Sequence, residues 1–130
     1  MNENKHTIAV KETIENLIKA GTSFDVDQLE VIYHKDLQVI MIDEQGELMM
    51  ADKNAFKSLF QTKRDNNEDA LNTWAQFNYI EANETSAHCL ITRKVKLTEE
   101  ERKLVLSIDL IWQDDRWQVT REVIFSQAID

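Results

Sequence analysis

The sequence contains few of the residues that interrupt helices and strands or form disulfide bonds and metal sites. Its 130 residues include no proline, two glycines (Gly21 and Gly46) and one cysteine (Cys89). So little glycine excludes a glycine-rich phosphate loop, and without Pro- or Gly-rich stretches no linker is expected, so one domain is predicted over residues 1–130. A single cysteine allows no intramolecular disulfide bond and no cysteine-based metal site.

Positive charge is also scarce, with 15 Lys and Arg against 24 Asp and Glu and a net charge of -9. That charge repels phosphates, so neither nucleic acid nor an anionic membrane is an expected partner. No apolar run approaches the roughly 18 residues of a membrane span, and the first residues lack a signal peptide's apolar stretch, so a cytoplasmic location is expected. The histidines (His6, His34 and His88) show no metal-binding spacing, and we expect neither a metal nor a cofactor.

Hydrophobic periodicity predicts three helices. The first covers about residues 4–20, with apolar residues at helical spacing and Gly21 as a left-handed cap. The second begins at Asp25, whose side chain can cap it, and ends near Tyr33. The third follows a capping residue at Asp52.

Alternating apolar and polar residues predict six strands. We expect them at about residues 37–42, 48–51, 72–82, 85–97, 103–113 and 116–126. The order is therefore α-α-β-β-α-β-β-β-β. Helices ahead of an antiparallel meander indicate an α+β domain, in which the helices cover one face of a strongly curved sheet.

Four segments are informative beside this order of elements: Ala20 and Gly21, Asp25–Tyr33, Asp52–Phe60 and Asp115–Val119. With them the chain resembles the NTF2-like superfamily, which includes ketosteroid isomerase, scytalone dehydratase, the SnoaL cyclases and the association domains of calmodulin-dependent kinases. The resemblance spans nearly the whole chain and implies a cone-shaped α+β barrel with a pocket at its open end. It also implies a homodimer formed through the outer face of the sheet. Because functions diverge widely on this fold, function has to be argued from the site.

The resemblance gives little support to isomerase chemistry. The isomerase's catalytic base falls at Met41 in this sequence and its helix-one tyrosine falls near Ile14, and neither side chain can move a proton. The remaining candidates for a pocket acid or base are Asp109 and His34. Alternation places Asp109 on the outer face, facing solvent or a dimer partner, so a catalytic role requires that assignment to be wrong.

Alternation also places two arginines, Arg93 and Arg121, on the inner face of the sheet. They either pair with carboxylates at the barrel rim or together bind a carboxylate or phosphate. In the kinase association domains, whose cavity is lined by arginines, one arginine lines up with Arg93. The predicted inner faces are Ala87, Cys89, Ile91, Arg93 and Val95; Leu104, Leu106, Ile108, Leu110 and Trp112; and Trp117, Val119, Arg121, Val123 and Phe125.

The sequence thus predicts a non-catalytic, homodimeric NTF2-like module that binds a small carboxylate-like ligand in its cone. Arg93 and Arg121 would supply charge, and Tyr33, Trp112 and Trp117 an apolar wall, although these aromatic residues can equally be barrel core. Two alternatives stay open. One is a cofactor-free lyase, cyclase or isomerase of the SnoaL type, and the other is an association domain whose function is oligomerisation.

Overall fold

The computed structural model describes residues 4–96 and 100–129, and within them the elements follow in the predicted order. The helices are α1 (Lys5–Thr22), α2 (Val26–Ile32) and α3 (Lys53–Asp65). The predicted strand 85–97 is resolved as Ser86–Val95, and its expected last residue, 97, lies outside the described residues. The strands are β1 (Tyr33–Ile42), β2 (Leu48–Asp52), β3 (Ala75–Ala82), β4 (Ser86–Val95), β5 (Arg102–Gln113) and β6 (Arg116–Ala128).

Two of the predicted helix caps are confirmed. The Asp25 carboxylate accepts the backbone N–H of Gln28 at 3.2 Å, and the Asp52 carboxylate accepts that of Ala55 at 2.8 Å. Each bond satisfies one of the N–H groups that the first turn of a helix leaves without a partner. These caps fix where α2 and α3 begin.

The predicted left-handed cap at Gly21 is wrong. Helix α1 continues through Thr22, and the left-handed backbone falls at Phe24, with φ of 58°. The Thr22 hydroxyl donates to the carbonyl oxygen of Ile18 at 2.8 Å. A side chain therefore satisfies a carbonyl group of the last turn, and no glycine cap is needed there.

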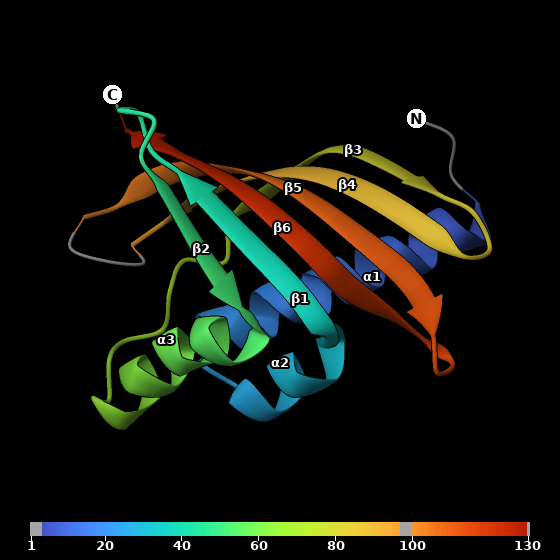
Figure 1. The fold of residues 1–130 in the computed structure, drawn as a ribbon, viewed down its shortest axis with the longest axis horizontal. Helices are drawn as coiled ribbons and strands as arrows, with labels where there is room; N and C mark the ends of the chain where they lie inside the picture. Colours follow the sequence, from blue (N-terminus) through green and yellow to red (C-terminus); the bar gives the residue numbers. More distant parts are fainter. Residues whose placement is uncertain (1–3, 97–99, 130) are drawn as a thin grey trace.

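The strands form one curved sheet among the described residues, in the order β2-β1-β6-β5-β4-β3. Neighbouring strands are antiparallel except β1 and β6, which pair in parallel. Figure 1 shows α1 passing beneath the concave face of this sheet, with α2 and α3 grouped near one end of β1 and β2. In the part of the chain that the structure describes, no helix has the length and apolar character needed to span a membrane.

The inner faces predicted for β4 and β5 are confirmed from Ala87 to Val95 and from Leu104 to Leu110, where alternate residues are buried. They pack with the apolar stripe of α1, whose Val10 and Ile14 are fully buried. Trp112 is an exception, since its side chain is 46% exposed. It lies near the end of the β5–β6 hairpin, where it meets Trp117 edge-on at 5.7 Å and is otherwise open to solvent.

A β-bulge in β6 overturns the predicted alternation of that strand. Asp109 of β5 pairs with Arg121 of β6. The next residue, Leu110, pairs with Val119, so Thr120 is an extra residue on β6. Beyond the bulge, every side chain of β6 lies on the face opposite to the one that strict alternation predicts. Arg121, Val123 and Phe125, predicted to face inward, therefore face outward, while Glu122 and Ile124 are buried.

Candidate functional site

A cavity of about 70 Å³ lies between the inner face of the sheet and helices α1 and α3. Most of its wall is aliphatic or aromatic, including Ile91, Leu106, Ile108 and Phe60. A few polar side chains interrupt this wall, and buried polar groups need partners or a function that explains their lack of one. Among the described residues they are Thr22, Tyr33, Arg93 and Glu122.

Glu122 is the most unusual residue of the cavity. The bulge at Thr120 turns it inward, where its side chain is 3% exposed. Its Oε2 atom is buried and has no hydrogen-bond partner among the described residues. Burial raises the pKa of Glu122 to about 7, while a hydrogen bond from Tyr33 and the charge of Arg93 act in the opposite direction. At neutral pH the carboxyl group is therefore close to half ionised.

Arg93 enters the cavity from β4 and is 8% exposed. Its Nε atom donates to the carbonyl oxygen of Trp74 at 2.8 Å, and its Nη2 atom donates to that of Asn72 at 2.5 Å. Burial lowers the pKa of the guanidinium group, and the charge of Glu122 raises it. Arg93 thus places a positive charge in the cavity that Glu122 also lines, and two of its N–H groups donate hydrogen bonds to the segment that precedes β3.

Tyr33 is the first residue of β1 rather than the last of helix two, and it is 3% exposed. Its ring packs against Phe56 at 5.8 Å between centroids. Burial, and then the charge of Glu122, raise the pKa of the Tyr33 hydroxyl well above its usual value. The hydroxyl therefore stays protonated and available as a hydrogen-bond donor beside Glu122.

The structure brings two of the five predicted ligand-binding residues together in this cavity, Arg93 and Tyr33. Arg121 is exposed on the outer face, where its Nη2 atom donates to Gln38 Oε1 at 2.9 Å, because the bulge moves it there. Trp117 is buried but does not line the cavity, and Trp112 lies at the exposed hairpin end.

The two candidate acid–base residues also lie outside the cavity. His34 is buried, and both its ring nitrogens are engaged. Its Nε2 lies 3.1 Å from Gln113 Oε1, and its Nδ1 accepts the backbone N–H of Asp36 at 3.0 Å. Asp109 lies on the outer face, as predicted, with its carboxylate 2.6 Å from His88 Nδ1.

The outer face holds a serine–histidine–carboxylate arrangement, since His88 Nε2 lies 3.5 Å from Ser107 Oγ while its Nδ1 meets Asp109. This is the order of groups in a nucleophilic triad. However, β4 and β5 are both paired on two sides, so the backbone N–H groups that would hold an oxyanion are engaged in the sheet. The arrangement therefore does not support acyl transfer.

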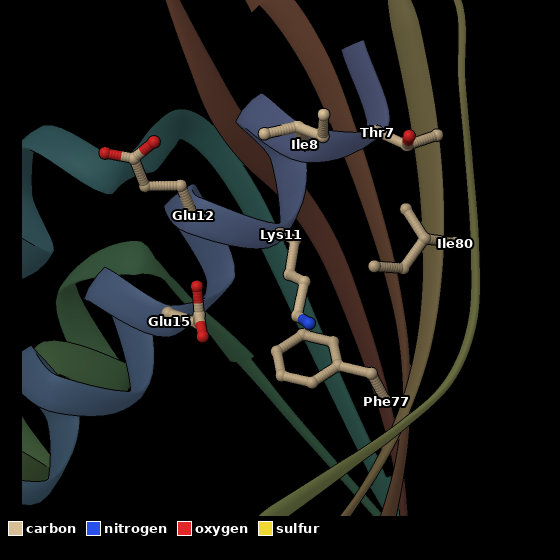
Figure 2. A pocket seen from close by; sticks show the side chains of 7 residues that line it. All are labelled: Thr7, Ile8, Lys11, Glu12, Glu15, Phe77 and Ile80. Carbon is tan, nitrogen blue, oxygen red and sulfur yellow. The ribbon is translucent and has the colours of Figure 1, made fainter. Parts of the chain in front are cut away.

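A second hollow, of about 370 Å³, lies at the surface between α1 and β3 (Figure 2). Lys11 extends over the ring of Phe77, with Nζ 5.3 Å from the ring centroid, while Glu12 points away from Phe77. Glu15 also lines this hollow. These three charged side chains are exposed. Because solvent already satisfies them, this hollow offers less binding chemistry than the cavity at Glu122. The described residues also contain no cluster of acidic, histidine or cysteine side chains suited to a metal ion.

Sequence reasoning missed Glu122, the central residue of the site. The three consecutive polar residues Thr120, Arg121 and Glu122 interrupt the alternation of β6, and this interruption is the signal that could have suggested a bulge. Arg93 was found because β4 pairs with β5 without a shift of register, so its side chains keep the predicted alternation between faces.

No family model and no curated protein matches the sequence, whereas solved structures match it over nearly its whole length. An NTF2-like protein of unknown function from Silicibacter pomeroyi has a TM-score of 0.77 at 17% identity, covering 97% of this chain and 99% of that one. An NTF2-like protein from Cytophaga hutchinsonii gives 0.74 at 17% identity, with 95% and 99% covered. One of unknown function from Shewanella baltica gives 0.70 at 11% identity, with 92% and 91% covered. The chain therefore has the NTF2-like fold, and at these identities the likeness concerns the fold alone.

Proposed function

We propose that this NTF2-like protein is a binding module that holds a small, largely apolar molecule in its cone cavity. The observation that carries the proposal is the Oε2 atom of Glu122, a buried acceptor without a partner at the wall of an otherwise apolar space. An unsatisfied buried acceptor costs about 1–3 kcal/mol. A ligand that fills the space and donates to this atom removes that cost.

The apolar wall supports this interpretation. Ligand sites in proteins are mostly apolar concavities with a few polar groups that fix orientation. Here Tyr33, Arg93 and Glu122 converge from three different strands on one cavity. A purely structural core has no need of a void that contains a carboxyl group with a raised pKa.

The first test is a fragment screen followed by protein-detected NMR on the wild type and on Val95→Phe. Val95 lines the cavity and is 4% exposed, so a phenyl ring at this position occupies the ligand's space. We expect binding to the wild type and its loss in Val95→Phe. The matched control is Val31→Phe, whose site on α2 is 47% exposed, and which should bind as the wild type does. Binding that survives in Val95→Phe would contradict the cavity as the site.

A second candidate function is cofactor-free proton transfer, because the cavity holds a carboxyl group whose pKa of about 7 suits a general base at neutral pH. Glu122 takes the place that sequence reasoning gave to Asp109 or His34. The carboxylate would accept a proton from carbon next to a carbonyl group, and Tyr33 would donate a hydrogen bond to the developing oxyanion.

This second function predicts deuterium exchange into a small ketone. Butanone incubated with the protein in D₂O should incorporate deuterium next to its carbonyl group faster than in buffer, as followed by proton NMR. Glu122→Gln should return the rate to that of buffer, while Glu84→Gln, an exposed residue between β3 and β4, should not. Equal rates of deuterium incorporation with and without the wild-type protein would contradict proton transfer and would not affect the proposed binding function.

We also propose that two copies associate through the outer face of the sheet. This face carries an apolar patch, defined by exposed Leu48, Met50 and Phe125 with partly buried Ile40, Ile42, Leu90, Val105 and Val123. Beside the patch, Arg121 and Asp109 place opposite charges on neighbouring strands. A two-fold axis can set each charge of one copy against the opposite charge of the other, which supports a second copy as the partner.

A further inference from the structure

The polar groups of the cavity differ in what they still offer a ligand. Arg93 already donates to the carbonyl oxygens of Trp74 and Asn72. Tyr33 lies beside Glu122, and its hydroxyl group acts to lower the pKa of the Glu122 carboxyl group. Glu122 keeps Oε2 as a buried acceptor that no described residue reaches. Among the described residues, Oε2 of Glu122 is thus the buried polar atom of the cavity that lacks a partner, and the partner it needs is a donor.

The charges of the cavity restrict the ligand further. When Glu122 is ionised, its negative charge balances the positive charge of Arg93. Apart from these two residues and Tyr33, none of the described residues that line the cavity is ionisable. A carboxylate ligand would place two negative charges against one guanidinium group, and an ammonium ligand would add a second positive charge beside Arg93. In a site of low polarity either imbalance is costly, whereas a neutral molecule leaves the balance of charge between Arg93 and Glu122 unchanged.

We propose that the cavity selects a neutral molecule with a short apolar body and one terminal O–H or N–H group, which donates to Oε2 of Glu122. This inference rests on the binding function proposed above and specifies the class of its ligand. An alcohol or a primary amide meets the description. This ligand class replaces the carboxylate-like ligand expected from two inward-facing arginines, because Arg121 lies on the outer face of the sheet.

Such a ligand binds the ionised form of Glu122, so its binding releases a proton near neutral pH. The groups that face Glu122 do not reverse this sign. Arg93 on β4 keeps its charge, since guanidinium groups stay protonated in proteins, and Tyr33 on β1 has a pKa held well above its usual value. Helices α1 and α3 and strand β5 present no ionisable side chain to the cavity among the described residues. Affinity for a neutral donor must therefore rise with pH, and affinity for a carboxylate must fall.

The test uses three probes of matched size: propionamide, propionate and propylammonium. Each is titrated into the full chain at pH 6, 7 and 8, with binding followed by protein NMR. Propionamide should bind most tightly at pH 8. Its affinity should rise about tenfold from pH 6 to pH 8, the change expected when only the ionised form of a group with a pKa of about 7 binds.

The variants separate this inference from the function on which it rests. Glu122→Gln should abolish the pH dependence, and the exposed Glu84→Gln should keep it. Preference for propionate, with affinity that falls as pH rises, would overturn the neutral ligand class and leave cavity binding in place. Absence of binding by all three probes would overturn the inference, and the fragment screen with Val95→Phe then decides whether the proposed function falls with it.

Discussion

Glu122 makes the stability of the fold depend on pH, because burial raises the pKa of its carboxyl group from 4.5 to about 7. Between these values the folded protein holds a proton that the unfolded chain has released. The free energy of unfolding therefore falls as pH rises through this window, by about 3 kcal/mol from this group. Below pH 4.5 both states are protonated and the contribution is constant.

The substitution Glu122→Gln should remove that dependence, since glutamine keeps the shape but does not ionise. Urea unfolding at pH 4.5 and pH 7.5 measures the effect as the difference between the two proteins. From pH 4.5 to pH 7.5, the free energy of unfolding of the wild type should fall by about 3 kcal/mol relative to that of the variant. Parallel profiles for the two proteins would show that Glu122 titrates at its ordinary pKa.

Arg93 is expected to couple to Glu122 through charge. Arg93→Met removes the positive charge that lowers the pKa of Glu122, so that pKa should rise further, as a carbon-13 NMR titration of the carboxyl group would measure. The loss also leaves the carbonyl oxygens of Asn72 and Trp74 without their donor, and we expect a destabilisation on the order of 3 kcal/mol. Arg93→Lys keeps the charge and should leave the pKa of Glu122 near 7. An unchanged pKa in Arg93→Met would contradict the coupling.

At this scale the sequence predicted one of the two buried charged residues of the cavity and missed the other. Arg93 stands among Cys89, Ile91 and Val95 at strict alternation, so its inward direction could be read directly. Glu122 could not be read in this way, because its face depends on an extra residue two positions earlier.

At the scale of the element, the bulge at Thr120 sets which side chains of β6 reach the core. Deleting Thr120 should reverse this assignment, placing Arg121 and Phe125 inward and Glu122 and Ile124 outward. We expect unfolding, or a destabilisation of more than about 3 kcal/mol, in thermal melts followed by circular dichroism.

The control for this deletion is Thr120→Val, which keeps the length of the strand. It loses the hydrogen bond from the Thr120 hydroxyl to the carbonyl oxygen of Asp109, of 3.2 Å, and should cost about 1 kcal/mol. A deletion variant as stable as this control would mean that the register between β5 and β6 can slip without penalty.

The helices and the strand order could be predicted because their signals are local. Helix periodicity and the capping residues Asp25 and Asp52 lie within a few residues of the structure that they determine. A bulge is different, since it is defined by the register of two strands. The sequence of β6 shows an interruption at residues 120–122, and only its pairing with β5 tells which residue is the extra one.

At the scale of the whole molecule, the outer apolar patch predicts self-association. Phe125→Glu places a charge where a side chain that is 48% exposed would be buried between two copies, and we expect it to give a monomer. Sedimentation velocity on the wild type and the variant measures the change, with Ile8→Glu, at an exposed position of α1, as the control. A wild type that stays monomeric at high protein concentration would contradict the proposed dimer.

The parallel pairing of β1 with β6 has a consequence for how the chain folds. Gln38 meets Arg121 across 83 residues of sequence, so this pair closes one of the longest loops in the domain. Contacts between residues this far apart form only after the entropy of closing the loop has been lost, which slows folding. Until β6 docks, one edge of the β1–β2 hairpin stays unpaired, and Glu122 remains in water with its ordinary acidity. The cavity is thus completed in the same step that removes this exposed edge, and a folding intermediate without β6 would be prone to aggregate and unable to bind.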